Sequence, residues 1–182
     1  MENFNLDTLK IGYFIIYKGN NNLFCKVVKN EQLESGFSKE ESEYTHVEIS
    51  GGGYWAINAK WPRSSLINIL KDHKARYVKV VKYRSTNYDI KRYKVGWFGA
   101  TRCNLPYSLL SVLWFKINDF IFKTRNIFAT KKAPFCSFMC AWALKQVYSE
   151  AFEKPEEILP AHFLNKDKFE LVWEGYLPDK EK

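Results

Sequence analysis

The sequence predicts an α+β domain in which a mainly antiparallel sheet, or a small barrel, packs against helices. Stretches with strand patterns and stretches with helix patterns are partly segregated along the chain, which is typical of α+β folds. One pair of strand-like stretches is joined by three consecutive glycines, which indicates an antiparallel hairpin. With 182 residues, 46% of them hydrophobic and 17% aromatic, the chain can fill the core of one domain, 1–182.

The first third of the chain is predicted to supply strands. Residues 11–17, IGYFIIY, form an apolar run typical of a buried strand. The sequence GNNN that follows indicates a turn, and 23–29, LFCKVVK, is interpreted as a returning strand. Residues 30–43 contain five glutamates and a glycine, which predicts an exposed acidic loop. The glycine-closed hairpin then occupies 44–59.

The rest of the chain is predicted to be mostly helical. Helices, one of them a short turn, are expected over 62–72, 86–95, 107–122, 136–152 and 160–165. Apolar alternation predicts two further strands, at 76–84 and 169–173. The charged tail 176–182 is expected to fray.

Charge and hydropathy limit the expected partners. The formal net charge of +8 permits contact with an anionic polymer, but no basic cluster is longer than two residues, so we expect no specific nucleic-acid site. The most apolar run, 105–122, is interrupted by Lys116 and Asp119 before the ~20 residues that a membrane span needs. The start MENFNLDTLK lacks a secretory signal pattern. We therefore expect a cytoplasmic protein, or a virion-associated one if it is of phage origin.

The cysteines give no metal-binding pattern. The chain has four: Cys25, Cys103, Cys136 and Cys140. Without a leader sequence, they are expected to be free thiols in a reducing compartment. No CxxC is present, and neither His73 nor His162 lies at ligand spacing from the close cysteine pair. We therefore expect no metal and no cofactor.

The hairpin 44–59 separates its residues into two faces. If the three glycines form the loop, Val47 pairs with Ile57 on an apolar face, and His46 pairs with Asn58 on a polar face that also carries Glu48. A register shifted by one would place Val47 opposite Asn58 and mix the faces. The His46–Asn58 contact would fix the imidazole in one tautomer. The alternative is a half-buried histidine on a hydrated face.

A cysteine at a predicted helix start supplies a candidate nucleophile. Pro134 precedes the helix in APFCSFMCAWALKQVY, which places Cys136 in its first turn. A helix N-terminus and a nearby imidazolium lower a cysteine pKa to ~3.5–7.5. Cys140 lies one turn deeper, where burial keeps a thiol inert. The alternative is that both are core residues, but Cys136, His46 and Asn58 together have the residue types of a thiol acyl-transfer site.

The order of these motifs resembles the circularly permuted NlpC-type papain-like proteins, which include YiiX-like bacterial proteins and lecithin retinol acyltransferase. THVEIS, GGG and YWAINA resemble the family's histidine strand, turn and polar-Ala strand, and FCSFMCAW resembles its aromatic-Cys-Ser helix start. LKIGYFIIY resembles its Leu-x-x-Gly-Asp strand, with Tyr13 in place of the acid. Residues 106–108, PYS, and the late LPAHFLN are also similar. Glu48 stands where relatives often have glycine, and Asn58 where many have Glu or His.

The resemblance implies a permuted papain-like fold over roughly 9–174 and a Cys-His-Asn triad. Cys136 would attack a carbonyl as thiolate, His46 would carry the proton and Asn58 would orient His46. The backbone N–H of Cys136 would form half of an oxyanion hole. Candidates for lining the site are Glu48, Tyr13, Tyr44 and Tyr107, and the three tyrosines are also candidates for the second oxyanion donor.

Three functions fit these expectations. The first is a peptidase or amidase, for which the resemblance implies cell-wall peptidoglycan peptides as substrate. The second is a thioesterase or a lipid acyl hydrolase or acyltransferase, favoured if the helix expected at 107–122 lines a channel. The third is a catalytically silent structural or binding module, such as a phage component. The sequence leaves all three open.

Overall fold

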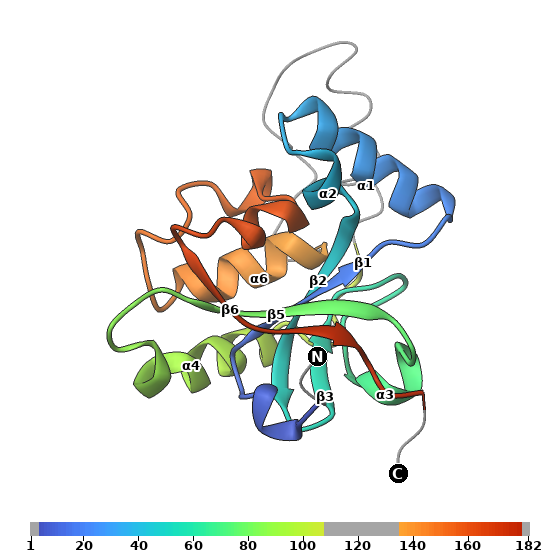
Figure 1. The fold of residues 1–182 in the computed structure, drawn as a ribbon. Helices are drawn as coiled ribbons and strands as arrows, with labels where there is room; N and C mark the ends of the chain where they lie inside the picture. Colours follow the sequence, from blue (N-terminus) through green and yellow to red (C-terminus); the bar gives the residue numbers. More distant parts are fainter. Residues whose placement is uncertain (1–3, 108–134, 180–182) are drawn as a thin grey trace.

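The computed structural model describes residues 4–107 and 135–179 (Figure 1). Over these residues the fold is α+β, with one six-stranded antiparallel sheet in the order β4-β3-β2-β1-β5-β6 and five α-helices. Because β4 and β6 are free edges, the sheet is open and is not a barrel. The strands are β1 (Phe14–Lys18), β2 (Tyr44–Gly52), β3 (Trp55–Asn58), β4 (Ser65–Asn68), β5 (Tyr77–Tyr83) and β6 (Phe169–Tyr176). The helices are α1 (Leu23–Glu34), α2 (Lys39–Ser42), α3 (Ile69–Asp72), α4 (Tyr88–Ala100) and α6 (Cys136–Lys145), with short 3-10 turns at Leu6–Thr8, Pro155–Glu157 and Pro160–Leu164.

The centre of the sheet is the best-buried part of the molecule. Strand β1 lies between β2 and β5, and its first four residues, Phe14 to Tyr17, are fully buried. Helices α4 and α6 pack on each other and on β2 (Figure 1). The predicted helix 107–122 lies outside the described residues, except for Tyr107. Within the described ranges, no helix combines the length and apolar character needed to cross a membrane.

The strand predicted at 23–29 and the loop predicted at 30–43 are wrong, because both stretches are largely helical. Asn22, interpreted as part of a turn, is the N-cap of α1, and its Oδ1 accepts from the N–H of Cys25 at 2.8 Å. Ser38 and Glu41 form a capping box at the start of α2. The 30–43 stretch is mostly exposed, as expected, but it is folded.

Other boundaries differ by several residues. The segment predicted as a short helix over 62–72 is half strand (β4) and half helix (α3). Helix α4 continues through two glycines to Ala100, whereas α6 ends at Lys145, earlier than predicted. The first two residues of the tail predicted to fray are ordered, because β6 runs to Tyr176 and Leu177 donates a backbone hydrogen bond to Arg76. The strand at 76–84 and the turn near 160–165 are confirmed.

The hairpin is confirmed, but its register is wrong. The structure pairs Ile49 with Ile57 and Ser50 with Ala56, and the turn closes between Gly52 and Trp55. The turn is therefore two residues long, and an irregularity between Ser50 and Gly52 absorbs one extra residue. Such a bulge restores the alternation that a two-residue turn would otherwise invert. The two faces are kept, but the cross-strand partners change.

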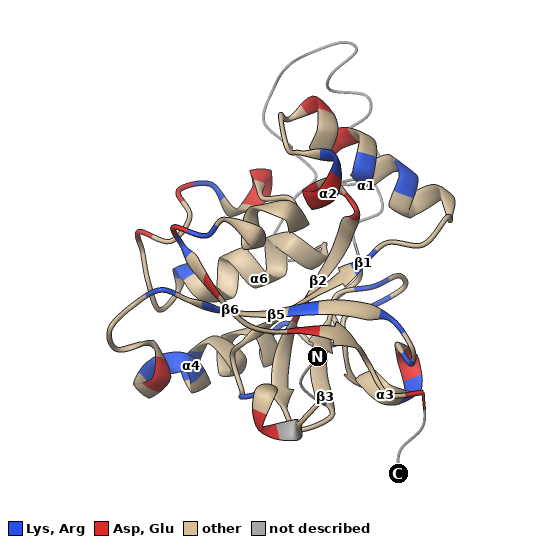
Figure 2. Cartoon of the chain, in the orientation of Figure 1, with Lys and Arg blue, Asp and Glu red and all other residues tan. Residues whose placement is uncertain are grey.

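Charged residues are distributed over the structure. Figure 2 shows Lys and Arg on α1, α4 and β5 as well as on loops, while α6 is almost uncharged. Some of the basic residues pair with acids, as Lys79 does with Glu174 at 3.5 Å and Lys82 with Glu170 at 3.5 Å. The absence of a specific nucleic-acid site stays a prediction.

A glycine at the entry to β1 supports a stability prediction. Gly12 has φ +85, and a Cβ added there would overlap the carbonyl oxygen of Arg92 in α4. Replacing Gly12 with alanine is expected to lower the free energy of unfolding by about 3 kcal/mol, through both backbone strain and overlap. The matched control is Gly36→Ala, because Gly36 has φ +87 but nothing within 4 Å of an added Cβ. Urea denaturation should give the control a loss of only about 1 kcal/mol; equal losses would show that α4 does not pack closely on Gly12.

Candidate active site

Helix α6 begins at Cys136 and packs on β2 (Figure 1). Pairing of β2 with β3 starts only at Ile49, which leaves the backbone N–H and C=O of Val47 available on that side. The N–H of Val47 hydrogen-bonds the sulfur of Cys136. The carbonyl of Val47 accepts from Sγ of Cys140 at 3.7 Å. Two cysteines one turn apart thus dock α6 on β2 and bring Cys136 to His46, the residue before Val47.

A buried carboxylate connects His46 to two further side chains. Glu48 follows His46 by two residues on β2, so both side chains are on the same face. Its Oε1 lies 3.0 Å from Nε2 of His46 and 2.8 Å from Nε2 of His73. Its Oε2 accepts a hydrogen bond from the hydroxyl of Tyr17 at 2.7 Å. Glu48 has no exposed surface, so these three donors replace the water that its charge would otherwise require.

The ionisation of Glu48 determines where the ring protons lie. Burial by itself raises the pKa of this carboxyl group, but the hydrogen bonds from His46 and His73 prevail and lower the pKa to about 2. An ionised carboxylate can only accept hydrogen bonds. Nε2 of each histidine therefore carries a proton, and Nδ1 is the nitrogen of His46 that remains for Cys136.

Cys136 and His46 form an ion pair. Burial raises the pKa of the Cys136 thiol, but the positive charge and hydrogen bond of His46, with the N–H groups of Val47 and Ser137, lower it below its usual value. Burial lowers the pKa of His46, yet the charge and hydrogen bond of Cys136, followed by the hydrogen bond to Glu48, raise it to about 10. Each group stabilises the charged form of the other. Both shifts favour the thiolate–imidazolium form of the pair.

The structure does not place Asn58 against His46. Continued beyond Ile49 and Ile57, the observed register puts Asn58 opposite Glu48. Asn58 is 3% exposed, and its Oδ1 has no hydrogen-bond partner. The position next to the histidine that was assigned to Asn58 is occupied by Glu48, which was expected only to line the site.

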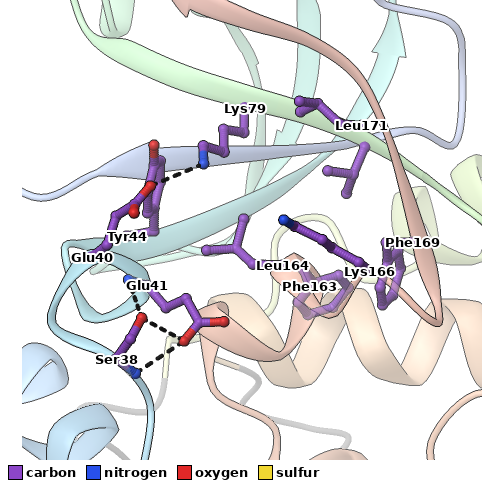
Figure 3. Close-up of a pocket in the computed structure, with 11 residues that line it drawn as sticks. Ser38, Glu40, Glu41, Tyr44, Lys79, Phe163, Leu164, Lys166, Phe169 and Leu171 are labelled. Carbon is purple, nitrogen blue, oxygen red and sulfur yellow. Dashed lines mark hydrogen bonds and ion pairs between the residues drawn. The ribbon is translucent and has the colours of Figure 1, made fainter.

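Two of the three tyrosines named as site residues lie elsewhere. The hydroxyl of Tyr13 donates to Asp89 of α4 at 2.9 Å. Tyr44 lines a separate hollow between α2 and strands β5 and β6, where the ammonium group of Lys79 lies 5.0 Å from the centre of its ring (Figure 3). Tyr13 and Tyr44 are therefore not oxyanion donors for Cys136. Both side chains belong to the packing of other elements.

Tyr107 remains next to the nucleophile. It is 8% exposed, and burial, followed by the nearby charge of Cys136, raises the pKa of its hydroxyl well above the usual value. Among the described residues, no hydrogen bond joins another cysteine to a histidine. Burial raises the pKa of Cys103, and it raises that of Cys140 well above the usual value. Cys136 is thus the cysteine whose pKa is lowered.

Two cavities flank the ion pair. On the side of His46 is a cavity of about 310 Å³, whose lining includes His46 and His73. On the side of Cys136 is a small void of about 20 Å³, whose lining includes Cys136 but neither histidine. Phe24 and Tyr107 line both spaces. A substrate carbonyl that reached Cys136 would therefore have room beside it mainly on the side of His46.

The donor atoms of His46, Glu48 and His73 lie within 4.8 Å of one another, close enough to raise the question of a metal ion. Two ligands bound tetrahedrally to zinc at ~2.0–2.1 Å would lie about 3.3 Å apart. The observed Nε2–Oε1 distances of 3.0 and 2.8 Å are shorter and fit N–H···O hydrogen bonds. We therefore interpret the three side chains as a hydrogen-bonded network and not as a metal site.

Neither a search of protein-family models nor a search of curated proteins gave a match to this chain. Similarity therefore does not assign it to a family.

Two members of the network were not found from the sequence. Tyr17 lies on β1 opposite His46, and His73 is the C-cap residue of α3. The strand pattern of 11–17 indicated that Tyr17 is buried, but not which face it occupies. His73 was considered only as a metal ligand for the cysteines. A buried glutamate beside the predicted base was the signal that could have prompted a search for its donors.

Proposed function

We propose that the chain is a cysteine-dependent hydrolase that cleaves amide bonds through Cys136, His46 and Glu48. The observation that carries this proposal is the buried chain of contacts from the Cys136 sulfur to His46 and from Nε2 of His46 to Glu48 at 3.0 Å. A nucleophile, a base and a group that orients the base are the parts that thiol acyl transfer needs. Glu48 replaces Asn58 as the orienting residue.

The first half of the reaction forms an acyl-enzyme. The thiolate of Cys136 attacks the carbonyl carbon, which forms a C–S bond and places a negative charge on the oxygen. When this intermediate collapses, the bond to the leaving group breaks, and Nδ1 of His46 gives its proton to the departing amine. The negative charge of Glu48 keeps His46 protonated until that step.

The second half of the reaction releases the acid. Water enters, Nδ1 of His46 takes one of its protons, and the oxygen attacks the thioester carbon. Breaking of the C–S bond restores the thiolate, and the ring is again imidazolium. Two carboxylate-linked N–H groups, on His46 and His73, stay unchanged through the cycle.

Stabilisation of the oxyanion is proposed to come from the start of α6. The first N–H groups of a helix have no partner in that helix, and the backbone N–H of Cys136 is one of them. Tyr107 is the remaining side-chain candidate for the second donor. Of the three tyrosines proposed from the sequence, it is the one whose pKa is raised in part by the charge of Cys136.

The permuted papain-like fold is part of the same proposal. What supports it is the chain order, with a histidine on a β-hairpin strand and, much later, a cysteine that opens a helix packed on that strand. Peptides, including cell-wall peptides, remain the proposed substrates. Acyl esters and thioesters share the same chemistry at the carbonyl.

The test is capture of the acyl group on Cys136. The full chain would be mixed with a series of activated peptide amides and acyl esters, and each cysteine-containing peptide would be analysed by mass spectrometry. We expect acylation at Cys136 and release of product in the wild-type chain, and expect both steps to be slowed in His46→Ala. Product release by Cys136→Ala at the wild-type rate, or equal acylation of Cys25, would contradict the proposal.

A further inference from the structure

The cavity on the side of His46 is electropositive. Its charged lining residues other than histidine are Lys60, just after β3, and Arg76, just before β5. Among the described residues that line it there is no aspartate or glutamate. Neither Lys60 nor Arg76 forms an ion pair with an acid in the described parts of the chain. Two cations that have no acidic partner among the described residues thus line one space of about 310 Å³.

The walls of the cavity are arranged to receive a ligand. Arg76 is held in place, because its Nη2 donates to the carbonyl of Lys18 at 2.7 Å and its guanidinium lies 5.7 Å from the centre of the Tyr17 ring. Trp61 adds an aromatic wall that is 63% exposed. Two cations that line one space beside an aromatic wall suit an oxyanion, which needs several donors at once.

The opposite side of the site has different chemistry. The void beside Cys136 is lined mostly by apolar side chains, and its one charged lining residue in the described chain is an acid, Glu31. Bases therefore gather on the histidine side and an acid on the cysteine side. At about 20 Å³ the void beside Cys136 is too small for a charged group of the substrate, which leaves the cavity of about 310 Å³ on the side of His46 to hold it.

We infer that the preferred substrates carry an oxyanion, a carboxylate or a phosphate, on the leaving group. This inference rests on the proposed function, because it uses the role of His46. His46 protonates the leaving group, so the leaving group must lie on the side of His46 and enter the cavity that contains Lys60 and Arg76. The leaving part of an N-acyl amino acid, or of an acylated phosphate compound, has the required charge.

Matched substrates test the inference. Three acetyl esters would be compared with the full chain: those of 4-hydroxybenzoate, of 4-hydroxyphenyl phosphate and of 4-hydroxybenzamide. We expect kcat/KM to be about tenfold higher for at least one anionic ester than for the neutral amide ester. The better of the two anionic esters identifies the source of the oxyanion. Lys60→Met and Arg76→Met should each reduce the ratio of anionic to neutral kcat/KM several-fold, whereas Lys74→Met, an exposed cation outside the cavity, should leave that ratio unchanged.

Failure of the inference and failure of the proposed function have different outcomes. Turnover that depends on Cys136 but shows no preference for either anionic ester overturns the inference alone. Turnover that persists in Cys136→Ala overturns the proposed function. If no ester is cleaved, the test uses alkylation of Cys136 and compares its rate with anionic iodoacetate to its rate with neutral iodoacetamide. If neither Lys60→Met nor Arg76→Met changes the ratio of these two rates, the inference is overturned.

Discussion

Replacing Glu48 with glutamine is expected to reduce kcat about a hundredfold to a thousandfold at neutral pH, because loss of the orienting carboxylate removes the charge that stabilises imidazolium. Without that charge, the proton of His46 returns to Cys136 and the nucleophile becomes a neutral thiol. The effect should fall mainly on kcat, since Glu48 is fully buried and touches no substrate. Steady-state kinetics on the best substrate from the acylation test would measure it.

The Glu48→Gln variant should keep the fold, so a loss of kcat would be due to the missing negative charge. The amide oxygen of glutamine can accept from Nε2 of both His46 and His73, as Oε1 of Glu48 does. The amide N–H₂ group then faces Tyr17, whose hydroxyl can turn from donor to acceptor. Each of the four side chains in the network therefore keeps at least one hydrogen-bond partner. Near-wild-type urea denaturation would verify that the geometry is retained.

Asn58→Ala is the matched comparison, since Asn58 is as buried as the network and was the residue expected to orient His46. With Oδ1 unpartnered, its removal should change kcat by less than about threefold. The opposite ranking, a large loss for Asn58→Ala and a small one for Glu48→Gln, would return the orienting role to Asn58. Tyr17→Phe removes one of the three donors to Glu48, so its loss of kcat should lie between those of Asn58→Ala and Glu48→Gln.

The hairpin shows how far the sequence could lead. Alternation of apolar and polar residues identified both strands and assigned His46 and Glu48 to one face, because that assignment needs only the period of a strand. The register depended on the number of residues in the turn, and three glycines permit either a three-residue loop or a two-residue turn with a bulge. The structure has the second, and the side chain opposite Asn58 changes from His46 to Glu48.

Local sequence patterns predicted the position of Cys136 better than they predicted the residues that hydrogen-bond to Glu48. A proline before the helix and an apolar continuation indicated a cysteine in the first turn, and the structure has it at the first position. Tyr17 and His73 are brought to Glu48 by strand order and by the end of α3, which no local pattern encodes. For the same reason the sequence could not distinguish Tyr107 from Tyr13 and Tyr44.

The error at 23–29 has a local cause. The stretch LFCKVVK contains a β-branched pair, which favours a strand when read alone. Helix α1 buries Cys25, Val28 and Gln32 at spacings of three and four positions, which is the spacing of one helix face, and it also buries the adjacent Val27. Gln32 then bonds the carbonyls of Ser42 and Tyr44 at 3.1 Å, so α1 is held against β2 by contacts that a seven-residue window does not include.

At pH 6, Cys136 is expected to react with iodoacetamide about a hundredfold faster in the wild-type chain than in His46→Ala. His46 lowers the pKa of the Cys136 thiol. As the pH falls, the wild-type chain should therefore keep its thiolate at pH values where a cysteine without an imidazole beside it is already protonated. Loss of the imidazole returns the pKa toward or above its usual value, because burial remains, and a thiol with a pKa near 9 is about 0.1% ionised at pH 6. The lower intrinsic nucleophilicity of a low-pKa thiolate offsets part of the gain, which leaves about two orders of magnitude.

The shape of the pH profile separates an ion pair from a cysteine that is merely accessible. For Cys136 the alkylation rate should be nearly flat through neutral pH, while for Cys103, whose pKa is raised by burial, it should rise about tenfold per pH unit in the same sample. Substrate turnover should fall again at high pH, as His46 loses its proton near its pKa of about 10 and can no longer protonate the leaving group. A Cys136 rate that rises in parallel with that of Cys103 would mean that the sulfur and the imidazole do not share a proton, and the hydrolase mechanism would lose its nucleophile.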